Sequence, residues 1–85
     1  MANDQLVNEL IALIEDCKAE KISLPEKAIG EVDMRDDLGF DSLDLIEILF
    51  RIEQDYSVPI NGDELVEKNL LQLGKLADYI DTNQQ

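Results

Sequence analysis

Apolar residues recur every three or four positions in two long segments of the chain, which is the spacing of an amphipathic helix. The first predicted helix runs from about Asp4 to Lys18, and Asn3 or Asp4 can cap it. The second runs from Ser42 to about Tyr56. On a helical wheel its buried centre consists of Leu45, Leu49, Ile52 and Tyr56, with Ile46 and Ile48 flanking it.

Two shorter helices are predicted in the last third of the chain. The third helix should lie near Asp63 to Lys68, because the preceding Asn61 can cap it and Glu64 completes a variant of the capping box. The last helix should occupy roughly Leu73 to Asp81, followed by a frayed tail over residues 82–85.

A long connection separates the first two helices. Pro25 favours an extended conformation at the residue before it, so a continuous helix is not expected here. We expect its apolar residues to attach it to the bundle; these are Ile22, Leu24, Ile29 and Val32. With no strand pattern and no repeat, residues 1–85 form a single all-α domain with an ordered core over about 4–81. The predicted fold is a small four-helix bundle with a long first loop and a short third helix.

Charge narrows the choice of partners. The chain has 20 acidic and 7 basic residues, a formal net charge of −13. Such a surface repels nucleic acid and anionic membranes, and it favours proteins with basic patches. Disorder does not explain the acidic composition, because 45% of the residues are hydrophobic and their spacing is periodic.

Several kinds of chemistry are excluded by what the chain lacks. There is no histidine and only one cysteine, Cys17, so Ser-His and Cys-His nucleophiles and a structural zinc site are not expected. Read as a calcium-binding loop, the segment from Asp33 places Arg35 at a ligand position and Leu38 where glycine is needed. No segment is apolar enough to span a bilayer and no signal peptide is visible. We therefore expect a cytoplasmic monomer that carries something and is not itself an enzyme.

Ser42 is the residue on which the functional prediction depends. One interpretation makes it the N-cap of the second helix, a common place for serine. In the other, Asp41 caps the helix and Asp44 completes an acidic variant of the capping box. Ser42 then takes the first helical position with its hydroxyl free, where the positive end of the helix dipole favours an attached anion. The second interpretation fits the spacing better, because Leu45 cannot reciprocate a Ser42 cap.

The run Asp36-Asp37-Leu38-Gly39-Phe40-Asp41-Ser42-Leu43 resembles the phosphopantetheine-attachment motif of acyl carrier proteins. The order of helices and loops is also similar to that family over roughly residues 4–81. The resemblance implies that Ser42 receives a phosphopantetheine arm from coenzyme A through a phosphopantetheinyl transferase. It implies a carrier that holds acyl groups as thioesters for the enzymes of fatty-acid or polyketide-type biosynthesis.

The outward face of the second helix is the predicted docking surface. Leu43 and Phe50 are apolar residues two turns apart on this face, although they can instead cover the core edge of the long loop. In carrier proteins the corresponding face binds partner enzymes. By that resemblance Leu43 and Phe50 are anchors, and Asp44, Glu47 and Glu53 steer acyl-loading and acyl-processing enzymes with basic patches.

The cargo should lie between the second and third helices, near Ile46, Leu65 and Leu70. Two other functions stay open. One is an aminoacyl or peptidyl carrier of a nonribosomal-peptide-type pathway. The other is an acidic interaction module without a prosthetic group, in which the match around Ser42 is accidental.

Overall fold

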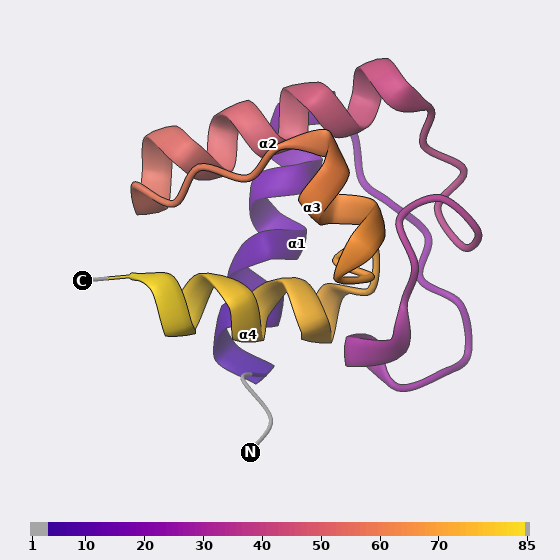
Figure 1. The fold of residues 1–85 in the computed structure, drawn as a ribbon. Helices are drawn as coiled ribbons and strands as arrows, with labels where there is room; N and C mark the ends of the chain where they lie inside the picture. Colours follow the sequence, from indigo (N-terminus) through magenta and orange to yellow (C-terminus); the bar gives the residue numbers. More distant parts are fainter. Residues whose placement is uncertain (1–3, 85) are drawn as a thin grey trace.

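The computed structural model describes residues 4–84, which fold into four α-helices and one 3₁₀ turn (Figure 1). The α-helices are α1 (Asp4–Lys18), α2 (Ser42–Tyr56), α3 (Gly62–Glu67) and α4 (Leu73–Asn83), and the 3₁₀ turn η1 is Ile29–Glu31. The described residues contain no strand, and their one isolated β-bridge joins Asp33 to Gln72. The all-α, four-helix prediction is confirmed.

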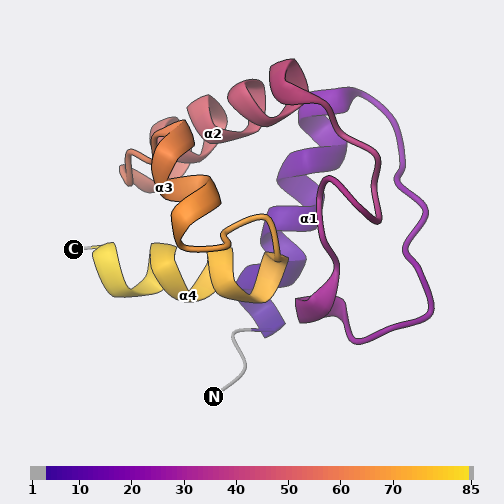
Figure 2. The same cartoon turned by 45° about the vertical axis from the view of Figure 1, so that its right-hand side comes forward.

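The helices enclose a single apolar core. In Figures 1 and 2, α2 and α4 lie at different heights along α1, and α3 descends from α2 toward α4. The long connection runs down one side and places η1 near the start of α4. The core has members from every helix and from the connection; those least exposed are Val7, Leu10, Ile14, Val32, Met34, Ile48, Ile52, Val58, Leu73, Leu76, Ala77 and Ile80.

Local sequence signals set most helix ends. The bounds of α1 and α2 agree with the prediction, although the proposed cap at Asn3 lies outside the described residues. Ser57, with a φ of 61°, takes the left-handed conformation that ends α2. The last helix continues two residues beyond its predicted end, and the Asn83 side chain donates a hydrogen bond of 2.7 Å to the Tyr79 carbonyl.

The burial pattern within α2 differs from the helical wheel at two residues. Ile46, placed beside the buried centre by the prediction, is 61% exposed. Ile48, which the prediction placed on the other flank of that centre, is fully buried. The reason is that α2 packs against α1, while Ile46 lies on a side that lines a cavity shared with the short α3. Tyr56 is partly buried, as is Cys17.

The long connection is attached to the start of α4 by backbone hydrogen bonds. The Met34 amide donates to the Leu71 carbonyl at 2.9 Å, and the Leu73 amide donates to the Val32 carbonyl at 3.0 Å. Both Val32 and Met34 are fully buried, and Met34 was not among the predicted anchors. The prediction for Leu24 is wrong, because its side chain is 44% exposed.

Candidate functional site

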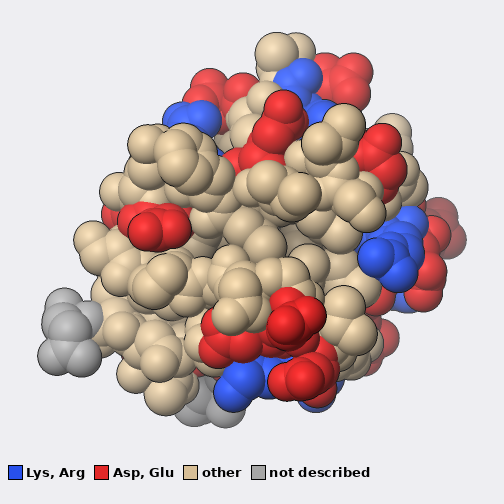
Figure 3. Space-filling view, turned by 45° about the horizontal axis from the view of Figure 1, so that its top comes forward, with Lys and Arg blue, Asp and Glu red and all other residues tan. Residues whose placement is uncertain are grey.

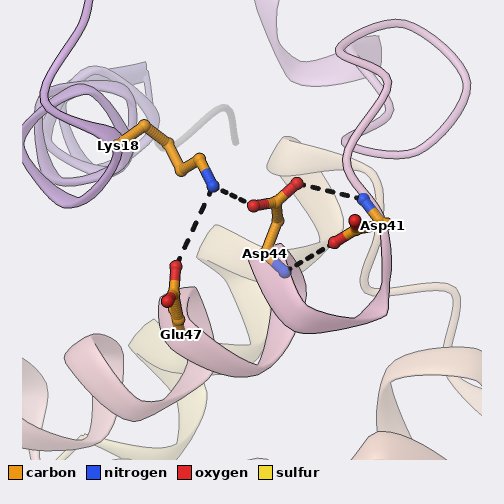
Figure 4. Close-up of polar contacts among 4 residues, drawn as sticks. All are labelled: Lys18, Asp41, Asp44 and Glu47. Atoms are coloured by element: carbon orange, nitrogen blue, oxygen red, sulfur yellow. Dashed lines mark hydrogen bonds and ion pairs between the residues drawn. The ribbon is translucent and has the colours of Figure 1, made fainter.

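The site is built around the first turn of α2, which begins with a reciprocal capping box. Asp41 is the N-cap, and its side chain accepts a hydrogen bond of 2.9 Å from the Asp44 amide. The Asp44 side chain in turn accepts one of 3.2 Å from the Asp41 amide (Figure 4). Because Asp41 satisfies the cap, Ser42 is the first helical residue and its side chain is not needed to hold the helix end.

The Ser42 side chain is exposed and chemically available. Within residues 4–84 its hydroxyl forms no hydrogen bond. The chain reaches it through Gly39, whose φ of +72° is a left-handed conformation that glycine adopts without strain. No atom within 4 Å would meet a Cβ at Gly39, so the backbone conformation, not lack of space, explains a glycine here.

Aspartates fix the loop that leads to this serine. The Asp33 side chain accepts hydrogen bonds of 2.8 Å from the amides of Arg35 and Asp36. The Asp37 side chain accepts one of 2.8 Å from the Asp33 amide and pairs with the Lys27 ammonium at 3.0 Å. The backbone amide, followed by Lys27, lowers the pKa of Asp37 below its ordinary value. These carboxylates are therefore bound within the loop.

Lys18 joins the end of α1 to the acidic start of α2. Its ammonium pairs with the Asp44 carboxylate and lies 3.9 Å from a Glu47 oxygen (Figure 4). The same ammonium lies 5.8 Å from the centre of the Phe40 ring. No local pattern indicates this contact, because Lys18 and Asp44 are 26 residues apart. It partly neutralises one of the carboxylates predicted to steer partners.

An apolar cavity of about 270 Å³ opens beside Ser42 between α2 and α3. Its lining comes from both helices and the loop: Arg35, Ser42, Leu45, Ile46, Leu49, Gly62, Leu65 and Val66. Two of the predicted cargo residues, Ile46 and Leu65, line it. Leu70 does not; it is buried and lines a separate hollow between α3 and α4. Arg35 was not predicted to be near Ser42.

The outward face of α2 carries exposed apolar side chains among carboxylates. Leu43 is 71% exposed and Phe50 is 62% exposed, so neither covers the core edge of the long loop. Ile46 and, on α3, Val66 extend the exposed apolar set. Glu47 and Glu53 are exposed as well. Figure 3 shows this side of the molecule as a broad uncharged area with acidic side chains at several places within and around it.

Comparisons with known proteins agree with this geometry. The family described as "Phosphopantetheine attachment site" matches residues 7–80. An acyl carrier protein of Karelsulcia muelleri is 36% identical over 75 residues, which cover 87% of this chain and 88% of the relative. An acyl carrier protein of Saccharopolyspora erythraea is 36% identical over 58 residues, covering 67% and 61%.

A third relative, the oxytetracycline polyketide synthase acyl carrier protein of Streptomyces rimosus, is 39% identical over 62 residues, which cover 73% of this chain and 64% of the relative. The chain thus spans slightly less than two thirds of two of these relatives and most of the other.

The fold and the site define a carrier domain of the phosphopantetheine-dependent class. Within that class, the chain belongs to the acyl carrier protein family. The cofactor of this family is phosphopantetheine. No helix among residues 4–84 is long and apolar enough to cross a membrane.

Proposed function

We propose that this protein carries acyl groups as thioesters on a phosphopantetheine arm attached to Ser42, and that it presents them to enzymes of fatty-acid or polyketide-type biosynthesis. The observation that carries the proposal is Ser42, an exposed residue that lines an apolar cavity and whose hydroxyl has no hydrogen-bond partner among residues 4–84. A covalently attached arm fits this arrangement, because the attachment atom faces solvent and an apolar surface lies beside it.

The residues of this chain prepare Ser42 for modification by other enzymes. Asp41 and Asp44 cap α2 and so leave the serine hydroxyl free. In the attachment reaction the Ser42 oxygen bonds to the phosphorus of pantetheine phosphate in coenzyme A. Adenosine bisphosphate leaves, and the hydroxyl proton passes to the phosphopantetheinyl transferase. When bound, the arm supplies a terminal thiol that holds the acyl group.

Tethering is the contribution of the carrier to catalysis by its partners. A covalently held acyl group reaches each docked enzyme at a high effective concentration, without the protein itself transforming it. The protein is thus a substrate of the transferase and of the acyl-loading and acyl-processing enzymes. A short acyl group would lie in the cavity between Ile46 and Leu65.

Partner enzymes would dock on the outward face of α2. Leu43 and Phe50 supply exposed apolar anchors, while Glu47 and Glu53 attract a basic rim on the partner. Asp44 contributes less long-range attraction than the sequence predicted, since Lys18 is paired with it. Docking by this face, the monomeric state and the cytoplasmic location stay predictions.

The intact mass of the protein after incubation with coenzyme A and a promiscuous phosphopantetheinyl transferase tests the proposal. The wild type should gain one phosphopantetheine, and Ser42→Ala should gain none while keeping its helical spectrum. Ser57→Ala is the matched control, because Ser57 is also exposed but ends α2 instead of beginning it. Modification of Ser42→Ala at normal yield, or none in the wild type, would contradict the assignment.

A further inference from the structure

Arg35 is the one charged residue that lines the cavity beside Ser42. The rest of the lining is apolar apart from the serine itself. This is unexpected for a chain in which acidic residues outnumber basic ones by 20 to 7. A cation that lines the same apolar cavity as the candidate attachment residue favours an anionic group there.

Two carboxylates close to Arg35 in the sequence are bound to other groups of the loop. Asp33 accepts hydrogen bonds from the backbone amides of Arg35 and Asp36, and Asp37 is bound by an amide and by Lys27. Across the described part of the chain, no carboxylate oxygen lies within 4.0 Å of the Arg35 guanidinium nitrogens.

Three of the six other basic residues are held in ion pairs between described residues, unlike Arg35. Lys18 pairs with Asp44, Lys27 pairs with Asp37, and Arg51 pairs with two aspartates. Each of these side chains connects parts of the fold. Arg35 makes no such connection between described residues, so its charge is available to a ligand.

We propose that Arg35 binds the phosphodiester of the arm on Ser42 and thereby turns the first part of the arm toward the cavity between α2 and α3. The inference rests on the proposed attachment at Ser42. A guanidinium is suited to this role, because its planar set of N–H donors matches the oxygens of a phosphate group. Arg35 is in this sense a positioning residue: it sets the direction in which the arm leaves the protein.

The test compares modified and unmodified protein in the wild type, Arg35→Gln, Arg35→Lys and Lys21→Gln. Lys21 is exposed and does not line the cavity, so Lys21→Gln removes one positive charge without affecting the proposed contact. Intact mass first establishes that each variant is modified. Failure of the wild type at that stage contradicts the proposed function, whereas every later readout compares modified variants and concerns Arg35 alone.

Nuclear magnetic resonance supplies the direct readout. In the wild type, the Arg35 side-chain N–H resonance and the phosphorus resonance should report a contact once the arm is attached. The phosphorus resonance should move in Arg35→Gln and be only partly restored in Arg35→Lys, which keeps the charge but not the planar set of donors. It should stay at the wild-type position in Lys21→Gln.

The melting midpoint supplies the second readout. Adding a negative charge to an acidic protein costs stability through self-repulsion unless a cation compensates it. Attachment of the arm should therefore lower the midpoint of Arg35→Gln more than that of the wild type or Lys21→Gln, and added salt should reduce the difference.

Three results would overturn the inference. The first is an Arg35 resonance that does not change on attachment. The second is an equal loss of stability in Arg35→Gln and Lys21→Gln, which would point to net charge alone. The third is a response that appears only when the arm carries an acyl group ending in a carboxylate. In that case the anion bound by Arg35 belongs to the cargo and not to the phosphodiester.

Discussion

At the scale of single residues, Tyr56 shows how a side chain on the last turn of α2 reaches α1. Its hydroxyl donates a hydrogen bond of 3.1 Å to the Glu9 carboxylate. Partial burial is the main cause that raises the pKa of Tyr56 to about 12, and the bond to Glu9 adds to it. Tyr79 has a raised pKa for a different main reason, its 2.8 Å hydrogen bond to Glu64.

The prediction for Tyr56 is a shifted phenol titration. Tyr79→Phe leaves Tyr56 as the one tyrosine, so its ionisation can be followed by phenolate absorbance. The folded variant should titrate near 12 and the urea-unfolded variant near 10. Because the folded-state pKa is the higher, the contribution of Tyr56 to stability is complete below pH 10 and is lost as the pH rises toward 12. Titration near 10 in the folded protein would count against the partial burial of Tyr56 and its hydrogen bond to Glu9.

The contacts of a single residue could be predicted from the sequence where its partner is a near neighbour along the chain. Asp41 and Asp44 are three residues apart, so the capping box could be recognised from spacing alone. Lys18 and Arg35 reach the site through tertiary contacts, and nothing in their local sequence indicates this. Leu70 was misplaced for the same reason: hydrophobicity predicts burial but not which cavity a side chain will face.

At the scale of elements, the closest backbone approach made by a glycine joins η1 to the start of α4. A Cβ at Gly74 would lie 2.8 Å from the Gly30 carbonyl oxygen and 3.2 Å from its Cα. These contacts are with backbone atoms, which cannot move aside as a flexible side chain can. The absence of a side chain at Gly74 therefore allows the long connection to pack against α4.

We predict that Gly74→Ala lowers the free energy of unfolding by about 1–3 kcal/mol, the usual range for overpacking. The better helix propensity of alanine, worth up to about 1 kcal/mol, offsets part of this loss. Gly62→Ala is the matched control, because a Cβ at this first residue of α3 meets nothing within 4 Å. Chemical denaturation measures both variants. Equal stability of the two would show that the Gly30–Gly74 approach does not limit packing.

The starts of α2 and α3 followed closely from the sequence, because each begins with a capping box that can be recognised from its spacing. The route of the long connection could not be predicted from the sequence. Met34 stands between two charged residues, so no periodic pattern marks it as core, yet it is fully buried where the connection bonds to the start of α4. Leu24 is apolar but exposed, since the loop near Pro25 stands away from the core.

At the scale of the whole molecule, the net charge of −13 acts on stability. Three of the basic side chains, Lys18, Lys27 and Arg51, are already engaged in ion pairs. Salt weakens those pairs only modestly, because exposed pairs contribute little, while it screens the larger repulsion among carboxylates. We predict that the melting midpoint rises with added potassium chloride. An uncharged solute of equal osmolarity is the control, and a midpoint that is flat or falls in salt would count against self-repulsion.

The docking of partner enzymes is also a property of the whole molecule. Phe50→Ala should weaken binding to the physiological partners by on the order of 2 kcal/mol, mainly through faster dissociation. Its melt should stay close to the wild type, because the ring is 62% exposed. Glu47→Lys should instead slow association in a salt-dependent way.

Glu31→Lys, an equal charge reversal on η1, is the control for Glu47→Lys, and Gln54→Ala is the control on the same face as Phe50. Association and dissociation rates with the transferase and acyl-loading enzymes distinguish the effects. Unchanged rates in both Phe50→Ala and Glu47→Lys would place docking on another face.

The shortness of α3 has a kinetic consequence. It has six residues, Leu65 is its one buried residue, and Val66 points to solvent. Segments with so little buried surface open at a lower free energy than the rest of the fold. We therefore expect amide hydrogens of α3 to exchange before those of α1, α2 and α4. The wall of the cavity beside Ser42 would then yield to a longer acyl chain by local opening, while the docking face on α2 keeps its shape.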